Sequence, residues 1–144
     1  MKNYSSYYFI VFFLSVVFIL RTCLWLFADL DLSFDEAQYW TWSLNPAWGY
    51  YSKPPFISWL INGFTFLCGD SEFCIRLGSP VLHSLSAYFI ALTACNFSRV
   101  KSSKFVGFVA ASIWILMPGI SLSSGFISTD VPLLFFTSLV LWSL

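Results

Sequence analysis

The chain has 144 residues, of which 58% are hydrophobic, 22% are aromatic and 10% are charged, and its formal net charge is zero. Ordinary soluble domains carry about 25% charged residues, so this composition excludes a water-soluble globular domain and indicates a chain that lies in a lipid bilayer. We expect the bilayer, and no nucleic acid, among its partners.

Apolar windows of membrane-spanning length dominate the sequence. A span needs about 20 mostly apolar residues, and residues 4–28, 77–97 and 105–127 meet this requirement. A fourth window, residues 131–144, is too short for a complete span, so we interpret the chain as the amino-terminal part of a longer protein. The sequence therefore predicts an all-α, polytopic integral membrane protein with an outer loop over about residues 29–76.

The first window contains Arg21, which would be costly to leave unpaired in hydrocarbon. This arginine interrupts the apolar run and no small-x-small cleavage site follows it, so we interpret the window as an uncleaved helix rather than a signal peptide. We expect its side chain to extend outward to the interface or to pair with an acid such as Asp29, and rank contact with a lipid phosphate below both. Arg21 is therefore a secondary candidate site residue.

The basic residues indicate the orientation. Arg99, Lys101 and Lys104 lie between the second and third windows, and Lys2 lies near the amino terminus, so both places should be cytoplasmic. This topology places all seven acidic residues on the far side of the membrane: Asp29, Asp31, Asp35, Glu36, Asp70, Glu72 and Asp130.

The outer loop should hold two short helices. Ser33 and Glu36 have the S-x-x-E spacing of a capping box, which predicts a helix that begins there, has Asp35 in its first turn and ends near Asn45-Pro46. The apolar stretch Phe56–Cys68 is too short to span the bilayer, so we expect an interfacial or re-entrant helix. Six aromatic residues around these helices fit an anchoring belt at headgroup depth: Tyr39, Trp40, Trp42, Trp48, Tyr50 and Tyr51.

Three charged residues of this loop are candidates for chemistry. Glu36 serves equally well as a helix cap or as a functional acid. Asp35 is not needed for the cap, and at a helix start it should stay ionised, so a functional role is favoured. Lys53 precedes two prolines that keep it out of a helix; it either extends to lipid headgroups or binds an anionic substrate group such as a phosphate.

Other polar residues have structural explanations. Arg76, four residues after Glu72, should form a helical ion pair, and remains a secondary site candidate. His83 lies deep in the second window and is expected to be a packed polar residue rather than a metal ligand. Cys68 and Cys74 lie on the outer side, where an oxidising compartment would permit a disulfide, although their spacing does not prove one.

An ordered set of motifs resembles the start of bacterial glycosyltransferases of the protein O-mannosyltransferase type, a group of GT-C enzymes that includes the aminoarabinose transferases of lipid A. The set comprises Asp35-Glu36-Ala37-x-Tyr39-Trp40, Trp48-Gly49-Tyr50, Lys53-Pro54-Pro55, Trp59-Leu60, Gly69-Asp70-Ser71-Glu72-Phe73, Arg76-Leu77 and Thr129-Asp130-Val131-Pro132-Leu133. The resemblance covers nearly the whole chain.

The resemblance implies an enzyme of the bacterial inner membrane. It would take a sugar from a polyprenyl-phosphate donor and transfer it, on the periplasmic or outer side, to lipid A, a protein or a glycan. Asp35 would be the catalytic base with Glu36 beside it, Lys53 would bind the donor phosphate, and Asp130 would bind the acceptor or shape the site. Asp130 is equally well explained as a first-turn residue of the fourth helix.

The sequence departs from the family at Ser52, where relatives often carry an acid or a histidine, so a metal site built on that position is in doubt. No cofactor is evident, and a divalent metal is not supported by this part of the chain. The alternatives to a glycosyltransferase are a non-catalytic transport or polysaccharide-export component and an inactive truncated product. The fragment alone is expected to be inactive.

Overall fold

The computed structural model describes residues 5–28, 30–99 and 103–144, which form α-helices and, within those ranges, no strand. The all-α class predicted from the sequence is confirmed. In chain order the helices are α1 (Ser5–Phe27), α2 (Phe34–Ser43), α3 (Phe56–Cys68), α4 (Glu72–Arg76), α5 (Gly78–Phe97), α6 (Ser103–Leu116), α7 (Pro118–Ser123) and α8 (Asp130–Ser143).

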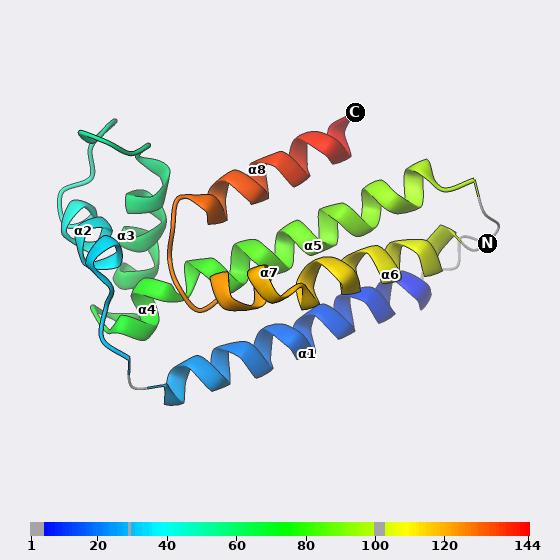
Figure 1. The fold of residues 1–144 in the computed structure, drawn as a ribbon, viewed down its shortest axis with the longest axis horizontal. Helices are drawn as coiled ribbons and strands as arrows, with labels where there is room; N and C mark the ends of the chain where they lie inside the picture. The colour runs from blue at the N-terminus through cyan, green and yellow to red at the C-terminus, as the bar shows by residue number, and fades with distance from the viewer. Residues whose placement is uncertain (1–4, 29, 100–102) are drawn as a thin grey trace.

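The longer helices α1, α5, α6 and α8 lie alongside one another, and α2, α3 and α4 gather at one end of them (Figure 1). Helix α5 packs against α1, α6 and α8, so it lies at the centre of the bundle. Small residues allow this close approach: Ala87 and Ala91 of α5 and Ala111 of α6 are fully buried in one apolar cluster.

Within the described residues, two helical stretches are long and apolar enough to cross a bilayer by length and composition, Tyr7–Phe27 and Glu72–Phe97. The window 105–127 is not one helix. Met117 has an extended backbone (ψ 132°) and Pro118, which lacks an amide hydrogen, starts α7, so the helix breaks between Leu116 and Pro118. The crossing of the membrane by this window, and by residues 131–144, stays a prediction.

The two ends of the bundle differ in charge. The start of α1, the end of α5 and the start of α6 lie at one end in Figure 1, and the Lys104 ammonium there is 5.1 Å from the ring centroid of Tyr7. The acidic starts of α2, α4 and α8 lie at the opposite end. This arrangement agrees with the charge separation inferred from the sequence; Lys2, Asp29 and Lys101 fall outside the described residues.

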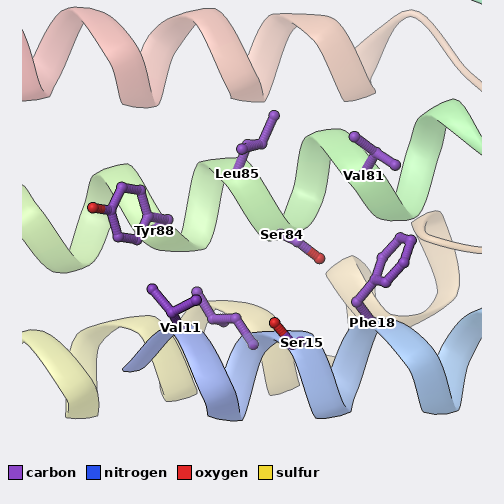
Figure 2. A pocket seen from close by; sticks show the side chains of 8 residues that line it. Val11, Ser15, Phe18, Val81, Ser84, Leu85 and Tyr88 are labelled. Atoms are coloured by element: carbon purple, nitrogen blue, oxygen red, sulfur yellow. The ribbon is translucent and has the colours of Figure 1, made fainter. Parts of the chain in front are cut away.

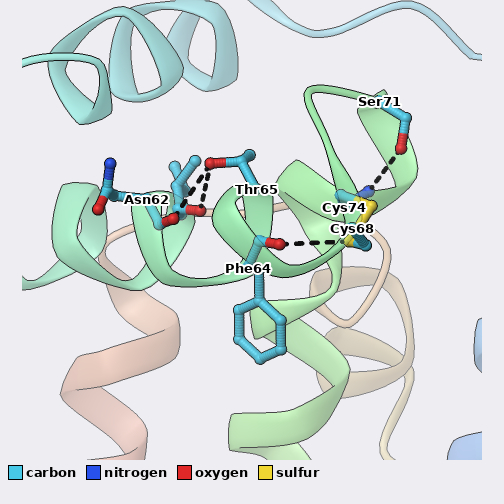
Figure 3. Close-up of a disulfide and its surroundings, with 7 residues drawn as sticks. Asn62, Phe64, Thr65, Cys68, Ser71 and Cys74 are labelled. Atoms are coloured by element: carbon cyan, nitrogen blue, oxygen red, sulfur yellow. Dashed lines mark hydrogen bonds between the residues drawn. A yellow bond between two sulfur atoms is a disulfide. The ribbon is translucent and has the colours of Figure 1, made fainter.

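The segment between α1 and α5 forms the helices that the sequence predicts, together with the short α4. Ser33 Oγ accepts a hydrogen bond from the Glu36 amide, and the Ser33 amide donates to Glu36 Oε2 at 3.0 Å, which confirms the capping box. Helix α3 has the predicted bounds. A disulfide between Cys68 and Cys74 links the end of α3 to α4 (Figure 3).

Close packing of α5 on α6 at Gly107 generates a stability prediction. A Cβ atom at Gly107 would lie 2.8 Å from the backbone oxygen of Ala91 and would overlap Cys95, so Gly107→Ala should force the helices apart and cost about 1–3 kcal/mol. Gly63→Ala is the control, because nothing lies within 4 Å of a Cβ atom there. Thermal melting of the purified protein should show a lower Tm for the first variant only; equal Tm values would contradict the packing.

Candidate active site

A buried carboxylate joins three segments at the α2 to α4 end of the molecule. Glu36 is 1% exposed, and its Oε1 and Oε2 accept hydrogen bonds from Arg76 Nε and Nη2, both at 2.9 Å. The same carboxylate accepts from the amides of Ser33 and Ile127, both at 3.0 Å. We call Ser33, Glu36, Arg76 and Ile127 the Glu36 cluster.

Arg76 is held on several sides. Besides Glu36, its guanidinium donates to the carbonyl oxygens of Leu30 and Asp31, both at 2.8 Å, and lies 5.7 Å from the ring centroid of Phe126. The predicted ion pair with Glu72 is therefore wrong: Arg76 pairs with a residue forty positions earlier in the chain. The physical reason is that a planar guanidinium gains two parallel charge-assisted bonds from the buried carboxylate.

The cluster keeps Glu36 ionised. Burial raises the pKa of the Glu36 carboxyl, but the hydrogen bonds from Arg76, Ser33 and Ile127 together outweigh it, so the net pKa lies below the ordinary value of 4.5. All of this carboxylate's described contacts are structural ones: a helix cap, an ion pair and a loop amide. Glu36 therefore fixes the beginning of α2 to α4 and to the segment that precedes α8.

The other candidate residues form no ion pair with one another in the described part of the chain. Asp35 is exposed in the first turn of α2, and Asp130 is exposed as the first residue of α8, three residues after Ile127. Lys53 is half-buried in the linker between α2 and α3. In the described part of the chain no ion pair involves Asp35, Lys53 or Asp130. Thr129, rather than Asp130, occupies the N-cap of α8, and its side chain makes no capping bond.

The linker that carries Lys53 is fixed by aromatic side chains. Tyr50 stacks on Trp42 with ring centroids 4.8 Å apart, and its hydroxyl donates to the Trp42 carbonyl at 2.9 Å. Trp59 of α3 donates from Nε1 to the Ala47 carbonyl at 3.0 Å. Tyr50 and Ala47, which precede Lys53 in the linker, are thus attached to α2 and α3 respectively.

The expected aromatic belt divides into two groups. Trp48 is 89% exposed, and Tyr51 is also exposed, as an anchoring role requires. Tyr39 is instead 2% exposed and packs in an apolar cluster with Ile57, Ile61, Ile75 and Ile127, so its assignment to the belt is wrong. Its position on α2 faces α3, and burial there removes more apolar surface from water than an interfacial site would.

Arg21 and His83 meet the broken third window. Arg21 Nη2 donates to the carbonyl of Ile115 and, at 2.6 Å, to Ser121 Oγ. The expected extension to the interface is therefore not seen, and the alternative partner Asp29 is outside the described residues. His83 is fully buried with Nε2 3.1 Å from Ser123 Oγ, which confirms it as a packed polar residue.

Sequence reasoning missed the roles of Ile127 and of the serines of α7. The small number of charged residues could have indicated that Glu36 and Arg76 form a pair, because buried charges must find partners. No local pattern indicates that the amide of Ile127 or the hydroxyl of Ser121 completes these sites, since both contacts depend on the tertiary fold.

Two open apolar grooves lie outside the charged residues. One, of about 370 Å³, lies between α1 and α5 and includes the hydroxyl-bearing Ser15 and Ser84 among otherwise mainly apolar side chains (Figure 2). The other, of about 400 Å³, lies along α3 from Phe56 to Leu67. The described residues contain no group of three His, Cys, Asp or Glu side chains that could hold a metal ion, so by themselves they offer no complete metal centre.

Comparison with known proteins assigns the chain to a family. Residues 52–144 match the model of the dolichyl-phosphate-mannose–protein mannosyltransferases. The chain belongs to this family. The resemblance inferred from the sequence motifs is confirmed, and with it the class of membrane glycosyltransferases of GT-C type.

A curated relative, the lipid A galacturonosyltransferase RgtD of Rhizobium johnstonii, is 43% identical over 116 residues, which cover 80% of this chain and 24% of the relative. The chain thus spans about a quarter of the length of that glycosyltransferase. No solved structure matches the chain. These similarities give no support to the alternative of a transport or export component.

The Glu36 cluster predicts an acid-dependent stability. Because the folded-state pKa is lowered, the carboxylate contributes stability above its ordinary value of 4.5 and loses it as the pH falls through the lower folded value. Glu36→Gln leaves Arg76 buried without its counter-charge and should cost about 3 kcal/mol at pH 7. Melting curves from pH 7 to below 4.5 should show the difference from wild type shrinking in acid.

The control is Asp70→Asn, which changes an exposed acid in the α3–α4 turn and should melt like the wild type throughout. A constant difference between wild type and Glu36→Gln across this pH range would contradict an ionised, paired Glu36.

Proposed function

We propose that the protein transfers a sugar from a polyprenyl-phosphate donor to an acceptor hydroxyl at the membrane surface. Support comes from membership of the glycosyltransferase family and from the different surroundings of two adjacent acids. Glu36 is buried and hydrogen-bonded to Arg76, whereas Asp35 is exposed. The curated relative acts on lipid A with galacturonic acid, as its name states. We therefore propose lipid A as the acceptor and a galacturonosyl residue as the sugar.

The proposed reaction is a direct displacement at the anomeric carbon. The oxygen of an acceptor hydroxyl bonds to this carbon while the bond from the carbon to the donor phosphate oxygen breaks. The proton of the hydroxyl passes to a carboxylate, and the departing polyprenyl phosphate keeps the bonding electron pair. The protein must therefore supply a base near the acceptor and a cation near the leaving phosphate.

Asp35 is the proposed base. Glu36 is less suited to this role, because its two oxygens already accept four hydrogen bonds and protonation would break the ion pair with Arg76. Asp35 is exposed in the first turn of α2 and takes part in no described ion pair, so its carboxyl group is open to an acceptor. The neighbouring Glu36 cluster fixes the backbone that carries Asp35, as a positioned base requires.

Lys53 is the proposed contact for the donor phosphate. It lies in the same outer segment, three residues after Tyr50, which attaches the linker to α2, and no described acid forms an ion pair with its ammonium. A lipid-linked donor would keep its tail among apolar side chains and present its phosphate at the surface. The groove along α3, which starts three residues after Lys53 at Phe56, offers such apolar surroundings.

Asp130 is proposed to bind the acceptor or to shape its site. It begins α8 at the same end of the molecule as α2, and the hydrogen bond from Ile127 to Glu36 fixes the preceding segment. The Cys68–Cys74 disulfide lies at this end as well, and disulfides persist in oxidising compartments. We accordingly propose the inner membrane of a bacterium, with this end on the periplasmic side.

Asp35→Asn tests the base. With a polyprenyl-phosphate-linked galacturonic acid as donor and lipid A as acceptor, turnover should fall by at least ~10²-fold while the donor KM changes little, because the amide cannot take the proton. Asp31→Asn, which alters a nearby exposed acid but keeps the carbonyl that binds Arg76, is the matched control. Retained turnover in a folded Asp35→Asn protein would remove Asp35 as the base.

Lys53→Ala tests the phosphate contact. Loss of the cation should raise the donor KM and lower kcat/KM by about 10²-fold, since the phosphate gains negative charge as it leaves. Ser52→Ala, at the adjacent exposed position, should behave like the wild type. An unchanged donor KM and rate in Lys53→Ala would show that the ammonium does not touch the donor.

A further inference from the structure

The break between α6 and α7 leaves backbone groups that a helix would have satisfied. Within a continuous helix the carbonyl of Ile115 would accept from the amide of residue 119, but the extended Met117 and the following Pro118 interrupt this pattern. An unsatisfied carbonyl is costly in apolar surroundings. Arg21 of α1 donates to this carbonyl and also to Ser121 Oγ, so one guanidinium joins the two sides of the break.

The far end of α7 is held in the same manner by α5. Ser79 Oγ donates to the Ser123 carbonyl at 2.7 Å, and His83 Nε2 lies 3.1 Å from Ser123 Oγ. All three residues are partly or fully buried. Polar side chains of α1 and α5 therefore hold this six-residue helix at Ser121 and Ser123.

The turn that follows α7 continues this chain of contacts toward the proposed active site. Trp25, one turn after Arg21 on α1, packs so closely on Gly125 that a Cβ atom there would overlap its ring, and it meets Phe126 with centroids 5.5 Å apart. Phe126 lies beneath Arg76, and the next amide, that of Ile127, donates to Glu36. Asp130 follows three residues later at the start of α8.

We propose that Arg21 is a positioning residue for the acceptor side of the active site: by bridging the α6–α7 break it sets the turn that leads to Asp130. The inference rests on the proposed function. It differs from a direct contact between Arg21 and the donor phosphate, because the guanidinium acts through Ile115, Ser121 and the turn. The buried Nη1 of Arg21 has no hydrogen-bond partner among the described residues. If this nitrogen contacted the donor phosphate, loss of Arg21 would raise the donor KM, so measuring that KM tests the direct contact.

The test compares Arg21→Met with Thr22→Ala in the complete membrane protein. Thr22 is the next residue of α1, and its hydroxyl bonds only to carbonyls of its own helix in the described contacts, those of Phe18 and Ile19. Using lipid A and the polyprenyl-phosphate donor, we expect Arg21→Met to raise the KM for lipid A and so to lower kcat/KM for lipid A about tenfold, with an unchanged donor KM. Thr22→Ala should match the wild type.

Two further variants separate positioning from lost stability. Ser121→Ala removes one of the two groups that accept a hydrogen bond from Arg21, so it should also raise the KM for lipid A. This variant takes the place of Arg21→Met if the latter does not fold. Adding Arg21→Met to Asp130→Asn should give little further loss, because the residue being positioned has already been changed. A loss of folded protein would instead lower kcat, and with it kcat/KM for donor and acceptor equally, without altering either KM.

The outcomes distinguish the inference from the function beneath it. Three results would overturn the positioning role while transfer by the wild type survives. The first is an unchanged KM for lipid A in folded Arg21→Met and Ser121→Ala, and the second is a raised donor KM. The third is a double variant of Arg21→Met and Asp130→Asn whose loss of activity is the product of the two single losses. Absence of transfer by both the wild type and Thr22→Ala would overturn the proposed function, and the inference with it.

Discussion

The ion pair between Glu36 and Arg76 is the interaction on which the arrangement of the outer helices depends. It joins α2 to α4 directly, and through the amide of Ile127 it reaches the segment before α8. Two charges removed from water attract one another strongly only when their remaining hydrogen-bonding groups are satisfied. The capping bond from Ser33 and the carbonyls of Leu30 and Asp31 meet that condition.

A second constraint acts inside the bundle, where the backbone must satisfy its own polar groups. The α6–α7 break violates the regular helical pattern, and the side chains that compensate come from other helices: Arg21 from α1, Ser79 and His83 from α5. The break and the Glu36 cluster are joined by the short turn of Gly125, Phe126 and Ile127. Packing of Trp25 on this turn and of Arg76 over Phe126 makes the two polar sites neighbours in one structure.

Local features of the fold could be predicted from the sequence, whereas its long-range pairings could not. The capping box at Ser33 and the bounds of α3 depend on residues a few positions apart, and both were predicted correctly. The partner of Arg76 was not predicted correctly. An i,i+4 pair with Glu72 is what the local sequence indicates, whereas the observed partner, Glu36, depends on how the tertiary fold brings α2 and α4 together. Pro118 was visible, but average hydropathy does not register a break that a distant arginine stabilises.

The geometry of α2 explains how two adjacent acids come to differ in their surroundings. Successive helical residues point about 100° apart, so when one carboxylate at the start of α2 turns toward Arg76 its neighbour turns away from it. The Glu36 carboxylate accepts hydrogen bonds from the Ser33 amide, from Arg76 and from the Ile127 amide, whereas Asp35 remains exposed on the same turn of α2. A base must be both held in place and free to accept a proton. Dividing these requirements between neighbouring residues satisfies both, which is why we propose Asp35 as the base, whereas the contacts of Glu36 are structural.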